Sequence, residues 1–69
     1  MNINKLFIFA NDLWKVKDAY NETHYLCANL EKEYELDLHK AFVDDLVNIY
    51  SSDEMSKIKR ERIDEKETF

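Results

Sequence analysis

Apolar residues recur at spacings of three and four along the N-terminal part of the chain. The residues that follow this spacing are Leu6, Phe9, Leu13, Val16 and Tyr20. Side chains at such spacings lie on one face of a helix, so the pattern predicts a helix over about residues 4–20. Asn21 is the expected stop, because asparagine tolerates the left-handed conformation of a C-cap. A strand over "KLFIFA" is the alternative, but nothing typical of a hairpin follows it.

The same periodicity predicts two more main helices. A narrow apolar stripe favours a second helix over about residues 21–35, with one continuous helix from Leu6 to Tyr34 as the alternative. A third helix is expected from an N-cap at Asp37 to about Tyr50, because an aspartate side chain can accept hydrogen bonds from the amides of the first turn.

The C-terminal part of the chain carries one further helix signal. The letters "SSDE" at 51–54 form a capping box, which predicts a weaker helix over about residues 52–63. The expected fold is therefore all-α, a small bundle of three main helices with a weak fourth C-terminal helix. Residues 1–58 would form this single helical domain, and the charged residues 59–69 would form a frayed or disordered tail.

Composition supports the helical interpretation. The chain of 69 residues contains no glycine and no proline. This excludes glycine-rich phosphate loops and disfavours a β-rich fold, because tight hairpins prefer turns that contain glycine. Aromatic residues make up 13% of the chain, which is unlike the composition of disordered proteins.

The residues with the most chemical potential lie in "YNETHYLCANLEKEY", which contains His24, Cys27 and Glu31. On a helix these three would lie along one edge, as metal ligands can. Structural zinc takes four ligands, so the set is incomplete, and we predict no metal and no cofactor. A catalytic Cys27 paired with histidine is disfavoured, because the neighbouring glutamates would raise the pKa of the thiol. We therefore predict no catalytic residue and interpret Cys27 as a core residue.

The net charge of −5 disfavours binding to nucleic acids and to anionic membranes. Carboxylates concentrate in the middle of the chain, and four of them are expected to form an acidic pole that docks on a basic surface of a partner protein. These are Glu31, Glu35, Asp44 and Asp45. A solvated acidic rim without a partner is the alternative.

Two of the expected helices have more apolar surface than a small bundle needs. Their apolar arcs are wider than the stripe of about 100° that is typical of a surface helix. The excess is expected to form an exposed shoulder that binds a partner, since tryptophan and tyrosine are common interface anchors. The shoulder residues are Phe7, Trp14, Val47 and Tyr50.

Together these features predict a non-enzymatic protein-binding module that occupies a partner surface through its acidic pole and its apolar shoulder. A self-associating helical structural subunit, as a homodimer or a larger bundle, is the alternative. In size and composition alone, the chain resembles the small accessory proteins of phages and mobile elements, including inhibitors of host defence. A single cysteine and the lack of a recognisable signal peptide favour the cytoplasm.

Overall fold

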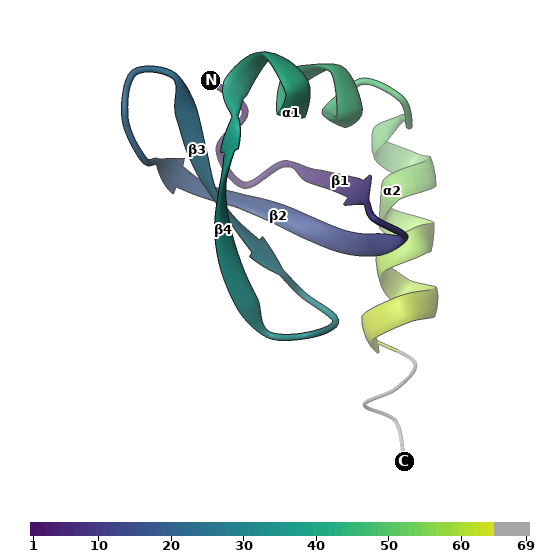
Figure 1. Ribbon diagram of the computed structural model, residues 1–69. Coiled ribbons are helices and arrows are strands. Elements are labelled where there is room, and N and C mark those ends of the chain that lie inside the picture. The colour runs from purple at the N-terminus through teal and green to yellow at the C-terminus, as the bar shows by residue number, and fades with distance from the viewer. Residues whose placement is uncertain (65–69) are drawn as a thin grey trace.

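The computed structural model describes residues 1–64, which form a four-stranded antiparallel sheet and short C-terminal helices (Figure 1). The strands follow one another in the sheet in chain order, so each pairs with the next through a hairpin. The elements are β1 (Leu6–Phe9), β2 (Asp12–Ala19), β3 (His24–Asn29), β4 (Tyr34–His39), α1 (Lys40–Val47), α2 (Ser52–Lys59) and the π-helical turn η1 (Arg60–Asp64).

The expected all-α bundle is wrong, because the segments assigned to the first two helices form strands. Burial on both faces of the sheet explains the error. Leu13 and Trp14 are adjacent in β2 and both are fully buried, although successive residues of a strand point to opposite faces. A strand that is covered on both sides loses the alternation of apolar and polar residues that would identify it.

Two of the hairpin turns form without glycine because other residues adopt positive φ angles. Ala10 (φ 51°) and Asn11 (φ 65°) make the two-residue turn between the paired residues Phe9 and Asp12. Positive φ at both positions is what a type I′ hairpin turn requires. Asparagine tolerates this conformation, whereas at Ala10 it costs about 1–2 kcal/mol. The longer turn between β3 and β4 has one such residue, Glu33 (φ 59°).

Asn21, which was expected to end a helix, instead folds the loop between β2 and β3. Its Oδ1 accepts hydrogen bonds from the backbone N of Thr23 and of His24, each at 2.9 Å. Asparagine commonly organises turns through such bonds to nearby amides. The backbone N of Tyr20 donates to the carbonyl oxygen of His24 at 3.0 Å, which closes the hairpin.

The third expected helix exists but is shorter than predicted. The helix α1 spans Lys40–Val47, and its N-cap is His39, whose Nδ1 accepts a hydrogen bond from the backbone N of Ala41 at 3.2 Å. Asp37, the predicted N-cap, lies inside β4. The boundary moved because the preceding residues pair with β3 and so cannot start a helix.

The predicted capping box is confirmed at the start of α2. Ser51 Oγ accepts from the backbone N of Glu54 at 3.1 Å, and the Glu54 carboxylate accepts from the backbone N of Ser51 at 3.0 Å. These bonds to Ser51 lower the pKa of Glu54. The helical segment continues through η1 to Asp64, and residues 65–69 of the expected tail lie outside the described residues.

The main core lies between α1 and one face of the sheet, which we call the inner face (Figure 1). Its buried side chains are Phe7, Trp14, Val16, Tyr25, Cys27 and Val43. The opposite, outer face carries the fully buried Leu13, while Met55 of α2 is the other buried apolar residue outside the main core. The C-terminal helices lie on this outer side. There Lys59 and Ile63 line a hollow of about 350 Å³ together with Leu6 and Lys15 of the sheet.

Candidate functional site

The residues of the expected apolar shoulder are divided between the core and the surface. Phe7 and Trp14 have no exposed surface, and their rings stack with centroids 6.3 Å apart. Val47 is half-buried and packs against the core, whereas Tyr50 is 37% exposed beyond the end of α1. The four residues therefore do not make one surface, and the two largest are inaccessible in the folded chain.

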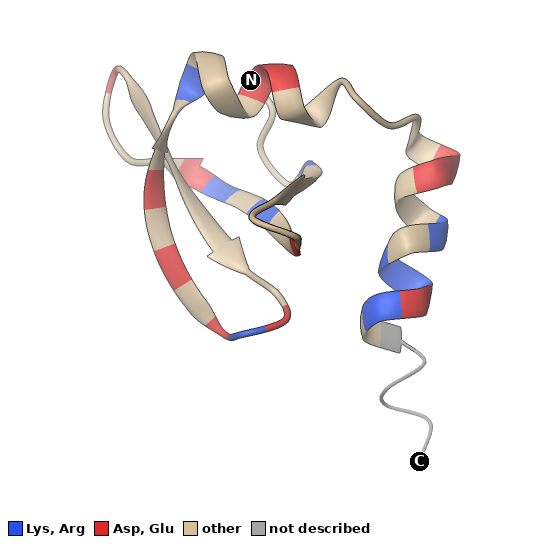
Figure 2. Cartoon of the chain, turned by 45° about the vertical axis from the view of Figure 1, so that its right-hand side comes forward, with Lys and Arg blue, Asp and Glu red and all other residues tan. Residues whose placement is uncertain are grey.

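The four carboxylates of the expected acidic pole lie at separate places (Figure 2). Glu31 is in the turn before β4 and Glu35 is near the start of that strand, while Asp44 and Asp45 lie on α1, beyond the end of the strand. The Asp44 carboxylate is already engaged, since it accepts a hydrogen bond from the hydroxyl of Tyr25 at 2.9 Å. The structure does not bring these carboxylates together.

Glu31 holds the C-terminal helical segment against the sheet. Its Oε2 accepts from the backbone N of Leu13 at 2.7 Å and from Arg62 Nη1 at 3.0 Å. Arg62 Nη1 also donates to the carbonyl oxygen of Asn11 at 2.8 Å. Glu31 and Arg62 thus connect η1 to the turn between β1 and β2 and to the turn between β3 and β4. Their role is structural.

The sheet separates the residues that suggested a metal or nucleophile site. His24 and Cys27 are three positions apart on β3, so they point to opposite faces, and Glu31 lies in the turn that follows. Within residues 1–64, no three histidine, cysteine, aspartate or glutamate side chains are placed to hold a metal ion. Burial raises the pKa of the Cys27 thiol to about 11.

We expect Cys27 to react slowly with iodoacetamide in the folded protein. The thiolate is the reactive species, and a pKa near 11 leaves far less thiolate at pH 8 than an ordinary cysteine has. The rate should be lower by about 100-fold or more than the rate in concentrated urea, measured by mass spectrometry. Equal rates in buffer and in urea would show that the thiol is accessible and not part of the core.

The two histidines form a cross-strand pair on the outer face. Residues His24 and His39 are paired in β3 and β4, and their ring centroids are 5.3 Å apart. The Nδ1 of His39 is an acceptor for the backbone N of Ala41, so this nitrogen is unprotonated and Nε2 carries the proton. Binding a metal through Nε2 would require the other tautomer and would break the cap of α1. The pair is therefore better suited to starting the helix than to holding a metal.

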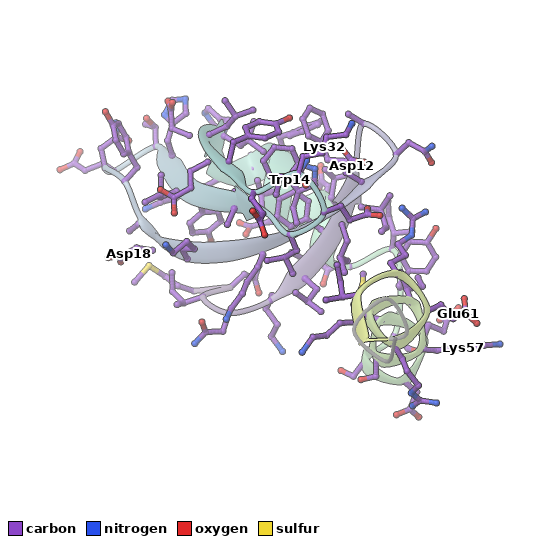
Figure 3. The ribbon with its side chains drawn as sticks, turned by 90° about the horizontal axis from the view of Figure 1, so that it is seen from below. Asp12, Trp14, Asp18, Lys32, Lys57 and Glu61 are labelled. Carbon is purple, nitrogen blue, oxygen red and sulfur yellow. The ribbon has the colours of Figure 1, made fainter. Side chains whose placement is uncertain are left out.

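A polar cluster, buried at Asp12 and Asn29 and exposed at Lys32, joins two hairpin turns at one end of the sheet (Figure 3). Asn29 Nδ2 donates to Asp12 Oδ2 at 2.9 Å, and Lys32 Nζ lies 2.9 Å from the same oxygen. The hydrogen bonds from Lys32 and Asn29 lower the pKa of Asp12, and Asp12 in turn raises the pKa of Lys32. Each of these polar groups has a partner within the cluster, so we interpret the cluster as stabilising the two turns.

The strands β1 and β4 are the two edges of the sheet, and β4 is the more open to a partner because nearly all of its residues are exposed, whereas those of β1 are buried or half-buried. All its residues are exposed except Leu38, which is half-buried. In an antiparallel ladder, residue pairs that are joined by backbone hydrogen bonds alternate with pairs that are not. The backbone N of Lys40 donates to the carbonyl oxygen of Thr23, so Thr23 and Lys40 are a hydrogen-bonded pair and the next such pairs are two residues further along β3 and β4. Glu35 and Asp37 fall between the bonded pairs, so their N–H and C=O groups point away from β3 into solvent.

The inner face of β4 carries exposed apolar side chains next to a row of aromatic rings that links the sheet to α1. Tyr34 and Leu36 are 44% and 41% exposed, and the ring of Tyr34 meets Trp14 edge-on at 5.4 Å. The row continues from Trp14 to Phe9 at 5.8 Å and from Phe9 to Phe42 at 5.3 Å. Trp14 is fully buried, so the exposed apolar side chains at this end of the sheet are Tyr34 and Leu36 of β4, and exposed apolar side chains that lie together are typical of interaction surfaces.

The outer face of β4 is acidic, with Glu35 and Asp37 between the apolar positions of the inner face. Figure 2 shows these carboxylates as red bands along the strand. Lys17 Nζ pairs with Glu35 Oε2 at 2.6 Å, whereas within residues 1–64 Asp37 has no ion pair. We call the outward backbone groups and side chains of Tyr34–Asp37 the β4 edge. The strict alternation in "YELDLH" is the signal that could have identified this strand from sequence.

Comparisons of the sequence and the structure with known proteins match no family model, no curated protein and no solved structure. Among residues 1–64, none of the helices has the length and apolar character needed to cross a membrane. Function is therefore inferred from the geometry and charge of the surface.

Proposed function

We propose that the chain is a non-enzymatic protein-binding module whose docking surface is the β4 edge. The observation that carries the proposal is an open strand edge whose inner face is apolar and exposed. An extended segment of a partner can add to such an edge as another strand, with backbone hydrogen bonds supplying affinity and side chains supplying specificity. Proteins usually cover, shorten, twist away or charge an edge that they do not use, and β4 carries charge on its outer face while its inner face stays apolar and exposed.

The arrangement of polar groups favours binding over catalysis. Cys27 is buried and faces away from His24, so the described residues do not pair this thiol with a base. The free thiol also favours a reducing compartment, and we place the protein in the cytoplasm. An inhibitor of the phage type would act in the same way, by occupying a surface that its target needs.

Proline substitutions should distinguish the outward from the inward positions of β4. Proline lacks the N–H group, so Asp37→Pro should leave the ladder to β3 intact, while Leu36→Pro removes a bond to it. We expect Asp37→Pro to melt close to wild type and Leu36→Pro to lose about 1–3 kcal/mol of unfolding free energy. Thermal melting followed by circular dichroism measures both, and the reverse order would mean that the open edge is misassigned.

Capture of partners from a lysate of the source organism then tests the docking function. We expect a protein retained by the wild type and by Asp37→Thr, which keeps the N–H group, to be lost with the folded Asp37→Pro variant. Equal retention by all three variants would contradict docking at the β4 edge. Sedimentation tests the alternative, because a wild-type dimer that Asp37→Pro dissociates would make the protein a self-associating subunit.

A further inference from the structure

We infer that the segment docking on the β4 edge is an extended strand of another protein in which basic and apolar residues alternate, a partner chemistry that rests on the docking function proposed above. In a strand added to β4, the residues opposite Glu35 and Asp37 are two positions apart and point to the outer face. The residue between them lies opposite Leu36 and points to the inner face. The alternation of β4 therefore dictates an alternation in its partner.

The outer face selects for positive charge. Asp37 is exposed and has no ion pair within residues 1–64, and Asp18 lies on the same face two strands away, in the row Asp18–Leu26–Asp37. Lys17 pairs with Glu35, and Lys15 lies on the same face in the neighbouring row Lys15–Ala28–Glu35. Two lysines therefore face three carboxylates in these two rows, and among the described residues the unpaired carboxylate on the edge strand is Asp37. A lysine or arginine opposite Asp37 would make a favourable cross-strand pair, and an acidic residue there would be repelled.

The inner face selects for apolar side chains. Leu36 and Tyr34 expose large apolar surfaces that a neighbouring strand would cover with every second residue. The apolar residues of the added strand would thereby extend the row of aromatic rings that runs from Tyr34 through Trp14 and Phe9 to Phe42. A strand with polar residues on both faces would leave this surface uncovered and would bind more weakly.

A second copy of the chain fits this edge poorly. In a symmetric antiparallel pairing of two β4 strands, one favourable backbone register places Glu35 opposite Asp37 of the second copy. The next register places Asp37 opposite Asp37 of the second copy. Like charges directly opposite one another destabilise strand pairing, and charged residues on an edge are a common protection against self-association. The carboxylates that oppose self-pairing are the groups that would attract a basic strand.

Short synthetic peptides of defined pattern test the inference directly. The first alternates valine with lysine, the second replaces each lysine by glutamate, and the third replaces each lysine by serine. The fourth is the lysine peptide with N-methyl groups on one edge, which removes its hydrogen-bond donors there. Binding is measured by fluorescence anisotropy, and the site by amide shifts in nuclear magnetic resonance spectra. We expect the lysine peptide to shift the amides of Glu35 and Asp37 and to bind about tenfold more tightly than the glutamate peptide.

Two charge reversals on the same face give a matched pair of variants. Asp37→Lys should weaken binding of the lysine peptide by about threefold to tenfold and reduce its salt dependence. Asp18→Lys makes the same change in net charge two strands from the edge and should have a much smaller effect. Equal effects of the two variants would mean attraction to overall charge and would overturn the inference.

The remaining outcomes separate the partner chemistry from the docking function. If the glutamate or serine peptide binds at the β4 amides as tightly as the lysine peptide, the edge docks strands but the basic partner is wrong. If the lysine peptide leaves the β4 amides unshifted, or the N-methylated peptide binds equally well, docking by strand addition itself is wrong. A wild-type dimer that pairs through β4 would also overturn the inference, because a second copy would then be the occupant.

Discussion

Trp14→Ala is expected to remove a large share of the unfolding free energy of the chain, so the variant should melt far below wild type. The indole is fully buried, stacks on Phe7, meets Tyr34 edge-on and donates from Nε1 to the carbonyl oxygen of Phe9 at 2.9 Å. Removing a core tryptophan side chain costs about 3–5 kcal/mol. A domain of 69 residues has roughly 3–10 kcal/mol of stability in total. Far-ultraviolet circular dichroism and thermal melting measure the loss.

Leu36→Ala is the control for this substitution, because Leu36 lies on the same face of the sheet but is 41% exposed. It should melt within a few degrees of wild type. The helical bundle expected from the sequence makes Trp14 an interface anchor, and then Trp14→Ala would stay folded. A Trp14→Ala variant that melts like wild type would therefore contradict the sheet core described above.

Asn29→Ala should lower the free energy of unfolding by about 3 kcal/mol. The Asn29 side chain is 1% exposed and makes three hydrogen bonds, each with a net worth of about 1 kcal/mol. Its Oδ1 accepts from the backbone N of Glu31 and of Lys32, and its Nδ2 donates to Asp12. The substitution would release the turn between β3 and β4 and leave Asp12 with fewer partners. The midpoint of urea unfolding measures the change.

Asn21→Ala gives a matched comparison for this prediction. Asn21 also accepts from two backbone amides in a hairpin loop, but it is exposed, so water can replace the lost bonds. We expect it to cost about 1 kcal/mol or less. Equal losses for Asn21→Ala and Asn29→Ala would show that burial of the polar cluster adds nothing to the strength of its bonds.

Features that depend on a few adjacent residues were predictable from the sequence. The capping box of Ser51 and Glu54 identified the start of α2 because both of its hydrogen bonds form within one turn of chain. Cys27 was predicted to be a core residue and is buried, since a small apolar thiol packs well in either a helix or a strand. The helix near residues 40–47 was also expected, although its boundaries were placed too wide.

The candidate site was largely missed, and the reason is specific to its residues. Of the residues expected to bind a partner, only Glu35 belongs to the β4 edge. Tyr34 was assigned to a helical stripe and Leu36 was not considered, although the alternation in "YELDLH" is regular. That segment is short and continues directly into α1, so its period of two is easily read as the start of a helix. The glycine-free turns then removed the usual marks of a hairpin.

The sequence by itself predicted the local elements of this protein: the capping box of α2, a helix near residues 40–47 and the core position of Cys27. Only the tertiary structure decided that the first half of the chain is a sheet and that β4 is its open edge. The physical reason is the range of the interactions. Helices are stabilised by bonds between residues three or four apart, whereas a strand is stabilised by partners elsewhere in the chain, such as Trp14 opposite Asn29. Which strands lack a second neighbour, and which of them stays exposed, are properties of the assembled sheet, so no single segment could reveal them.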